Sequence, residues 1–292
     1  MPGRVALVTG ATSGLGYATA AELGKRGDTV LVHGRTQLKA EQAVQRLSKV
    51  TGAGAGQYIA VYAELGSLDE VRQLAAQARD LSPGGLDVLI NNAGAQFNHR
   101  RLSADGIEMT TAVVHVAAAA LSRLLLDHLR RAGGSAHALA QVITVTSLNE
   151  RMGRLVTDWS YATGYRQVRA YSNAKLMALA YTYALARRVD EQEVTFGAAD
   201  PGIVFTDFGK KAGGFAGLSD RVLRPVAPLL IASPEKAARR SVLLAVDAAA
   251  AEGTGRFYAK GGLRMSSKRS RDPAVMEQVY EVTEERLSSA GI

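Results

Sequence analysis

Short apolar runs alternate with longer helical patterns along most of the chain, and this alternation limits the possible fold more than any other feature. The strand-like runs lie at about 5–8, 29–33, 58–62, 87–90, 141–146 and 194–199. Helical patterns lie between or after them, over about 15–26, 36–49, 67–80, 103–131 and 168–189. Strands separated by helices of this length form a parallel sheet covered on both faces. The prediction is a doubly wound, Rossmann-type α/β fold, with one domain over residues 1–292.

Composition and charge exclude several other classes of protein. Of the 292 residues, 47% are apolar and 21% are charged, as in an ordinary globular protein. No apolar run approaches the roughly 18 residues of a membrane span, and the first residues lack the order of a secretory signal. A cytoplasmic protein without a membrane span is therefore expected. The chain has no cysteine, and its five histidines lack metal-ligand spacing, so no metal site is expected.

The net charge of +8 suits a protein that holds a polyanionic cofactor. Most basic residues are scattered, but several cluster within residues 263–272. This stretch is either a solvated loop or a contact for an anionic partner. Because it has no interleaved aromatic residues and no nucleic-acid motif, the loop is favoured and no nucleic-acid partner is expected.

Three glycines, Gly10, Gly14 and Gly16, lie between the first strand-like run and the first helical pattern, in the stretch TGATSGLG. Glycine weakens both kinds of element, so its presence here needs another cause. At the first strand-to-helix turn of a doubly wound sheet, glycines let the backbone approach a ligand, and the helix presents free N–H groups. The stretch indicates a pyrophosphate site, although a glycine cluster alone can also be structural.

Five motifs resemble, in order, those of the short-chain dehydrogenase/reductase family. They are TGATSGLG (9–16), NNAG (91–94), TVTS (144–147), YSNAK (171–175) and PGIVFT (201–206). The C-terminal part, over 234–246, 255–262 and 272–287, resembles the retinol-dehydrogenase-like branch of that family. The resemblance extends over nearly the whole chain and implies a dinucleotide-dependent oxidoreductase.

Tyr171, Lys175 and Ser147 are the candidate catalytic residues. Tyr171 and Lys175 are four residues apart and so share one face of a helix. An ammonium group near a phenol favours the phenolate, so we expect Lys175 to lower the pKa of Tyr171 and make it an acid or base. Ser147 ends the fifth strand, at the sheet edge where ligands bind, and its hydroxyl can donate to the substrate oxygen.

The resemblance implies the same roles for these three residues, and adds that Lys175 binds the nicotinamide ribose. It further implies a cofactor channel along the strand ends. The implied cofactor-binding residues are Gly10, Thr12, Ser13, Gly14, Leu15, Gly16, Arg35, Glu64, Leu65, Asn91, Ala93, Gly94, Tyr171, Lys175, Pro201, Gly202, Val204 and Thr206.

The end of the second strand indicates which dinucleotide is bound. An NAD enzyme would place an acidic residue there for the ribose 2′-hydroxyl, but this chain has Gly34 and then Arg35. A guanidinium where a 2′-phosphate would lie favours NADP(H). An ordinary surface charge at Arg35 is the alternative.

The chain departs from the family pattern at three positions. The family has an asparagine on the fourth helix that supports proton relay, and Val114 stands in its place. His115 would point about 100° away from that site, so packing is favoured for it. Glu64 replaces an adenine-contacting aspartate, and Asp200 stands where the branch often has histidine.

Oligomeric state and substrate follow from two further patterns. The alanine-rich fourth helix suits close packing, either inside the monomer or, as is common in the family, in a homodimer or homotetramer. Two pocket segments, over about 148–168 and 205–230, supply aromatic residues that suit a hydrophobic small-molecule substrate or belong to the core. These aromatic residues are Trp159, Tyr161, Tyr165, Phe208 and Phe215.

Three functions remain open. The favoured one is an NADP(H)-dependent oxidoreductase that moves hydride between nicotinamide and a carbonyl or secondary alcohol, acting as a ketoreductase. Val114 motivates the second, a non-redox enzyme such as an isomerase, dehydratase or cyclase on the same fold. The third is a nucleotide-sensing or structural protein, which the Ser147, Tyr171 and Lys175 set disfavours.

Overall fold

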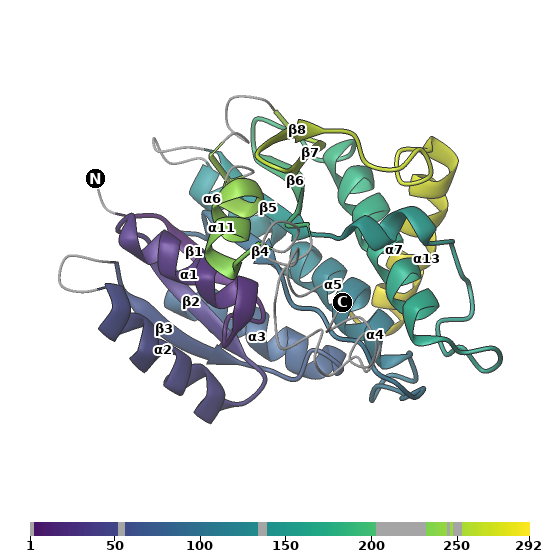
Figure 1. Cartoon of the computed structure of the whole chain (residues 1–292), viewed down its shortest axis with the longest axis horizontal. Coiled ribbons are helices and arrows are strands. Elements are labelled where there is room, and N and C mark those ends of the chain that lie inside the picture. Colours follow the sequence, from purple (N-terminus) through teal and green to yellow (C-terminus); the bar gives the residue numbers. More distant parts are fainter. Residues whose placement is uncertain (1–2, 52–55, 134–138, 203–231, 244–245, 248–252) are drawn as a thin grey trace, which may run out of the picture.

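One mixed sheet runs through the chain in the computed structural model, which describes residues 3–51, 56–133, 139–202, 232–243, 246–247 and 253–292 (Figure 1). Its eight strands lie in the order β3-β2-β1-β4-β5-β6-β7-β8. Their bounds are β1 Val5–Val8, β2 Thr29–Gly34, β3 Tyr58–Tyr62, β4 Val88–Asn91, β5 Ala140–Val145, β6 Val194–Asp200, β7 Arg256–Ala259 and β8 Gly262–Arg264.

The strand order reverses at β1, which pairs in parallel with both β2 and β4. Ligands of doubly wound sheets bind at such a reversal, beyond the carboxyl ends of the strands. The predicted fold class is confirmed, and the six predicted strands match β1 to β6 to within one residue at each end. The edge hairpin was not predicted: β7 is parallel to β6, and β8 turns back antiparallel to β7.

Helices cover both faces of the sheet (Figure 1). Contacts place α1 beside α2 and α11 on one side, and α3 beside α5 and α5 beside α7 on the other. The bounds are α1 Gly14–Lys25, α2 Gln37–Thr51, α3 Leu68–Leu81, α4 Met109–Thr111, η1 Ala112–Val116, α5 Ala117–Leu124, α6 Leu126–Gly133, η2 Leu148–Met152, α7 Gln167–Ala186, α11 Pro234–Ala237, η3 Ala238–Val242 and α13 Pro273–Ser289.

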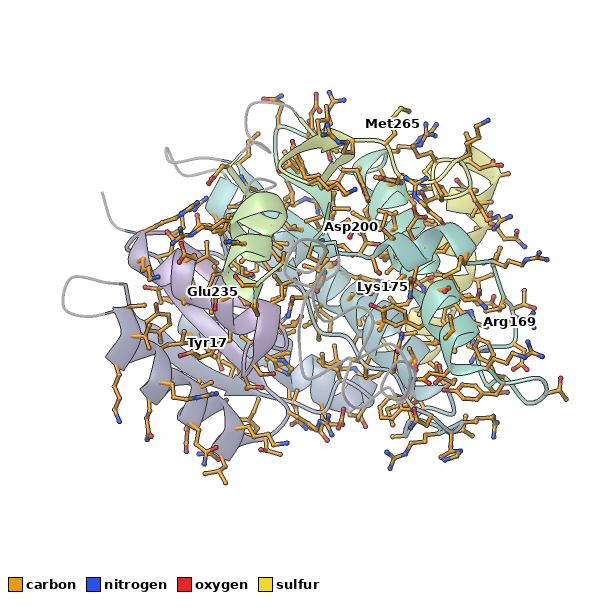
Figure 2. The ribbon with its side chains drawn as sticks, viewed as in Figure 1. Tyr17, Arg169, Lys175, Asp200, Glu235 and Met265 are labelled. Atoms are coloured by element: carbon orange, nitrogen blue, oxygen red, sulfur yellow. The ribbon has the colours of Figure 1, made fainter. Side chains whose placement is uncertain are left out.

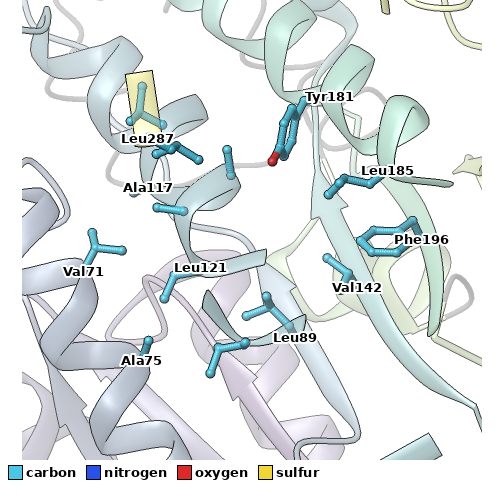
Figure 3. Packing of buried hydrophobic residues seen from close by; sticks show 14 of the residues in the cluster. Val71, Ala75, Leu89, Ala117, Leu121, Val142, Tyr181, Leu185, Phe196 and Leu287 are labelled. Atoms are coloured by element: carbon cyan, nitrogen blue, oxygen red, sulfur yellow. The ribbon is translucent and has the colours of Figure 1, made fainter. Parts of the chain in front are cut away.

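Side chains on successive residues of the strands divide the core into two layers. Leu7, Leu31 and Leu89 belong to the layer under α3, α5 and α7, part of which Figure 3 shows. The next residues along two of these strands, Val8 and Val32, belong to the layer under α1 and α2. Alternation with period two is what a pleated strand buried on both faces requires.

The stretch over 103–131, predicted as one helix, is divided into four pieces. The helical residues begin at Met109 because the buried carboxylate of Glu108 accepts from the N–H groups of Thr110 and Thr111, at 3.0 and 2.9 Å. A π-helical turn, η1, then interrupts the regular ladder, and the chain bends by 54° between α5 and α6. In the described part of the chain, no single helix could cross a membrane, although the bent pair Met109–Leu124 and Leu126–Ala132 could by length and composition.

The C-terminal helix α13 lies against α7 on the side away from the sheet (Figure 1). Tyr181 of α7 donates to Glu284 of α13 at 2.6 Å, and the same carboxylate accepts from Arg123 of α5 at 2.7 Å. Tyr280 stacks on Tyr181, with ring centroids 5.9 Å apart. The fourth helical stretch, for which a dimer surface was one of two expectations, is therefore packed in part by a segment of the same chain.

Candidate active site

A cleft of about 710 Å³ opens at the carboxyl ends of the parallel strands, where the strand order reverses. The glycine turn after β1 and the ends of β2 to β6 contribute to it. Its described lining is Gly10, Thr12, Ser13, Gly14, Leu15, Gly16, His33, Gly34, Arg35, Ala63, Glu64, Leu65, Asn92, Ala93, Gly94, Ala95, Gln96, Phe97, Arg101, Met109, Val113, Val145, Thr146, Ser147, Leu148, Asn149, Tyr171, Lys175, Pro201 and Gly202.

The glycine turn needs its glycines for two physical reasons. Gly10 and Gly14 have φ of +64° and +56°, backbone angles that residues other than glycine rarely adopt. Gly16 has no space for a side chain, because a Cβ would lie 2.4 Å from the Asn92 amide nitrogen and 2.4 Å from the Gly10 oxygen. These residues leave the start of α1 open to the cleft, so the backbone fits a pyrophosphate.

A buried histidine supports the turn from below. The Gly10 N–H donates to His33 Nδ1 at 3.0 Å, and His33 Nε2 lies 3.1 Å from the Ala63 oxygen. Burial lowers the pKa of His33 to about 4, so the ring is neutral at pH 7. The tautomer follows from its partners: Nδ1 accepts and Nε2–H donates. His33 thereby ties the glycine turn to the ends of β2 and β3.

The end of the cleft that lies beyond β2 and β3 holds a pair of opposite charges. The side chain of Arg35 is 63% exposed, and its Nε lies 3.5 Å from a carboxylate oxygen of Glu64. The other Glu64 oxygen accepts from the Gly66 N–H at 3.2 Å. An exposed guanidinium whose ion pair with Glu64 is this long is available to a phosphate.

Ser147, Tyr171 and Lys175 meet at the other end of the cleft. The Tyr171 hydroxyl is hydrogen-bonded to the Ser147 side chain, whose oxygen also accepts from the Asn149 N–H at 3.3 Å. Lys175 lies one turn further along α7, with Nζ 5.7 Å from the centre of the Tyr171 ring. Its ammonium group donates to the Val145 oxygen at 2.7 Å. The side chains form one continuous polar group at the end of β5.

Burial controls the protonation of this group. It raises the pKa of Tyr171 to about 12, against the opposing effect of the Ser147 hydrogen bond, and lowers the pKa of Lys175 to about 8. The expectation that Lys175 lowers the pKa of Tyr171 below its usual value is therefore wrong for the protein alone. The free-energy cost of removing the phenolate from water exceeds the stabilisation that the Ser147 hydrogen bond gives it. Tyr171 is a phenol at neutral pH.

Apolar side chains close the catalytic group on the side of η1. Val114 is 3% exposed and forms a small cluster with Tyr171 and Ala174. Val114, which the resemblance puts where the family has its relay asparagine, therefore contacts the catalytic tyrosine. His115 points elsewhere, as expected: its Nε2 lies 3.0 Å from the Thr283 hydroxyl of α13, and its ring packs edge-on against Trp159.

Comparison with known proteins decides the family. Residues 4–214 match the family model described as short chain dehydrogenase. Human retinol dehydrogenase 13 is 33% identical over 262 residues, which cover 88% of this chain and 76% of that protein. The chain belongs to the short-chain dehydrogenase family. Retinol dehydrogenase 14 of Mus musculus, 31% identical over 97% of this chain and 86% of its own length, agrees with the retinol-dehydrogenase-like branch.

A solved structure adds the cofactor class. The RhlG/NADP active-site complex of Pseudomonas aeruginosa matches with a TM-score of 0.69 and 26% identity, over 90% of this chain and 96% of that one. This short-chain dehydrogenase is accordingly an oxidoreductase with a nicotinamide cofactor. The cleft passes the physical test for such a group, because the first residues of α1 line it and the side chain of the N-cap residue Ser13 makes no hydrogen bond to their N–H groups, which can therefore bind a pyrophosphate.

The predicted site residues of this short-chain dehydrogenase that the structure describes line the cleft, except Asn91. Asn91 is buried behind the wall and donates to the Ser122 hydroxyl at 3.1 Å. Asn92 lines the cleft instead, and its amide donates to the Thr9 oxygen at 2.7 Å, which fixes the glycine turn. Val204 and Thr206 lie outside the described residues, as does the predicted pocket segment 205–230.

Three of the aromatic residues predicted for the substrate pocket have other partners, and the other two, Phe208 and Phe215, lie outside the described residues. Trp159 is 1% exposed and packs in the core, and Tyr161 accepts from Asn173 at 2.9 Å. Tyr165 donates to the Phe97 oxygen at 2.6 Å. Within the predicted segment 148–168, only Leu148 and Asn149 line the cleft among the described residues. The sequence pattern could not separate pocket from core aromatics because both are apolar and both follow the fifth strand.

Sequence reasoning missed the support behind Ser147. The carboxylate of Glu150, on the next turn of the chain, is 1% exposed and accepts from both the N–H and the hydroxyl of Ser267, at 2.9 and 2.6 Å. Ser267 lies in the basic stretch 263–272, which was expected to be a solvated loop or an anion contact. Its serines face inward, so part of this stretch holds the active-site turn in place.

Proposed function

We propose that this short-chain dehydrogenase uses NADP(H) and reduces a carbonyl group of a hydrophobic small molecule to the alcohol. The observation that carries the proposal is the meeting of Ser147, Tyr171 and Lys175 at the nicotinamide end of a glycine-lined cleft. When bound, the dinucleotide supplies or accepts the hydride.

Ser147, Tyr171 and Lys175 then have separate roles in the reduction. The Ser147 hydroxyl donates to the carbonyl oxygen of the substrate and stabilises the charge that develops there. The Tyr171 phenol gives its proton to the same oxygen. The buried ammonium of Lys175 stabilises the tyrosine as it loses that proton, because a positive charge nearby favours phenolate.

The reductive direction rests on the resting state of Tyr171. A phenol with a pKa of about 12 is ready to give a proton, whereas alcohol oxidation needs the deprotonated form. At pH 7 that form is scarce, so reduction is favoured by the protein's own groups.

The choice of NADP(H) and of a hydrophobic substrate rests on the two ends of the cleft. Arg35 places an exposed guanidinium at the end of β2, where the ribose 2′-phosphate would lie. Leu148, next to Ser147, contributes apolar surface to the described lining, to which Phe97 and Met109 also belong. Such surface suits a hydrophobic carbonyl compound.

A non-redox reaction on the same fold is the second candidate, favoured by one observation. Val114 and Ala174 give Tyr171 an apolar neighbourhood on the side of η1. Neither Val114 nor Ala174 can return a proton to Tyr171, which would slow repeated turnover.

The experiment follows NADPH absorbance with a panel of lipophilic aldehydes, ketones and quinones. We expect consumption by the wild type and its loss in Tyr171→Phe, which keeps the ring but removes the proton. Binding of NADPH without turnover on any carbonyl would instead favour the non-redox candidate.

Cytoplasmic location and homo-oligomer formation stay predictions. A homodimer or homotetramer would have to use surface that α13 leaves free, because this helix packs on α7 and contacts Arg123 of α5. Gel filtration with light scattering measures the oligomeric state directly.

A further inference from the structure

A buried carboxylate lies beside the catalytic group and has no role in the steps above. Asp200 is the last residue of β6 and is 2% exposed. One of its oxygens accepts from the Gly202 N–H at 2.8 Å, so the side chain turns over the Pro201–Gly202 edge of the cleft.

Strand register brings Asp200 close to the buried ammonium group. Val145 of β5, whose oxygen accepts from Lys175 Nζ at 2.7 Å, is the register partner of Ala199 of β6. The pairing of the two strands continues beyond Val145, because the Thr146 N–H donates to the Ala199 oxygen at 2.9 Å. Asp200 therefore follows directly on the backbone that faces the ammonium; both residues are labelled in Figure 2. The two side chains interact electrostatically.

Three cations act on Asp200, and they differ in exposure. Arg151 of η2 and Lys260 in the turn between β7 and β8 are exposed, and water screens their charges. Lys175 is 4% exposed, and Asp200 is the charged group that acts on it among the described residues. A buried ammonium without a counter-ion would tend to lose its proton.

We propose that Asp200 is the counter-ion of Lys175 and a positioning residue of the catalytic group, which keeps the ammonium charged and Tyr171 in its proton-giving form. This inference deepens the proposed function and rests on it. The carboxylate favours the charged lysine and disfavours the charged tyrosinate, and both effects increase the population of the phenol–ammonium pair. That pair is the form that reduces a carbonyl.

The proposal has a consequence for Val114 as well. Val114 gives the catalytic group an apolar contact on the η1 side, whereas Asp200 lies at the end of β6, where its carboxylate accepts from the N–H of Gly202, a residue of the cleft lining. A proton that returns to the phenol–ammonium pair can then approach along the β6 side, past the Asp200 carboxylate.

The first measurement needs no substrate. Lysine labelled with ¹³C at the ε-carbon is titrated by NMR in the full chain, with and without NADP, and the Lys175 signal is assigned with Lys175→Met. We expect a midpoint near 8 without NADP in the wild type, and a midpoint lower by about 1 to 3 pH units in Asp200→Asn, as for loss of a close opposite charge. Asp28→Asn is the matched control. Asp28 is also a buried carboxylate, but it directly precedes β2, at the amino ends of the strands, whereas Asp200 lies at the carboxyl ends.

The second measurement is the pH profile of NADPH-dependent carbonyl reduction. Asp200→Asn should move the alkaline limb of kcat to lower pH, and Asp200→Glu should restore part of it. A purely structural role would lower the rate at every pH without moving the limb.

The outcomes separate this proposal from the proposed function. An unchanged Lys175 midpoint in folded Asp200→Asn overturns the counter-ion, whatever the activity. A shifted midpoint without reduction of any carbonyl supports the counter-ion and contradicts the reductase. If Asp200→Asn does not fold, Asp200→Ser keeps an acceptor for the Gly202 N–H without the charge, and the same shift is required of it.

Discussion

Replacement of Arg35 by alanine tests the cofactor choice. In the free protein the guanidinium is 63% exposed and lies 3.5 Å from one Glu64 carboxylate oxygen. An exposed pair of this kind contributes at most about 1 kcal/mol, so Arg35 can exchange its partner for a phosphate at little cost. Hydrogen bonds to a charged group contribute about 1.5–3 kcal/mol each.

Arg35→Ala should therefore reduce kcat/KM for NADPH by roughly 10- to 150-fold, since 1.4 kcal/mol corresponds to a factor of ten. NADH lacks the 2′-phosphate, so its kcat/KM in the same variant should change less than about threefold, because the lost contact is to the phosphate alone. NADH is thus the internal control for damage to the cleft.

Glu64→Gln tests the same geometry in the opposite direction. It removes the charge that competes for Arg35, and NADPH should bind up to about fivefold more tightly, the equivalent of the pair's 1 kcal/mol. The assay is fluorescence titration with both dinucleotides. An equal loss for NADPH and NADH in Arg35→Ala, or no loss for either, would refute the assignment of the 2′-phosphate to Arg35.

Three further changes have definite expected results. Val114→Asn places an amide against Tyr171 and should raise the turnover of carbonyl reduction; a rate that does not rise contradicts the role given to the apolar wall. Gly16→Ala puts a methyl group 2.4 Å from Asn92, which displaces the turn, and should weaken NADPH binding at least tenfold in the same titration, equivalent to about 1.4 kcal/mol. His33 and His115 have pKa values lowered by burial to about 4 and about 3, so the unfolded chain binds more protons between pH 6.5 and 4 and stability falls as the pH falls through that range. From pH 7 to 5 the free energy of unfolding should drop by about 2 kcal/mol per histidine in urea titrations. In His115→Leu the same drop should be smaller by the contribution of one histidine.

The sequence predicted what local pattern and order decide. The strands, the sheet edge of the site and the cleft position of Gly10, Ser147 and Tyr171 all follow from periodicity and from motif order. The position of Val114 on the fourth helix was inferred from the resemblance to the family, and the structure puts its side chain against Tyr171.

Long-range contacts decided the rest. The pKa of Tyr171 depends on how completely packing excludes water, which the spacing to Lys175 does not report. Asn91 and Asn92 are adjacent and chemically identical, so only the pleat of β4 determines which of them faces the cleft. Glu150 and Ser267 are 117 residues apart, and no short motif joins them.

The packing of α13 has a consequence for the order in which the molecule folds. Tyr181 meets its partner Glu284 across 103 residues, and His115 meets Thr283 across 168. Contacts between such distant segments form only after a large loop closes, which makes them slow to form. The helix that carries Tyr171 and Lys175 thus has one side uncovered during early folding, with Tyr181 still in water. We expect nicotinamide binding to appear late in refolding, together with the burial of Tyr181, rather than with the first formation of the sheet.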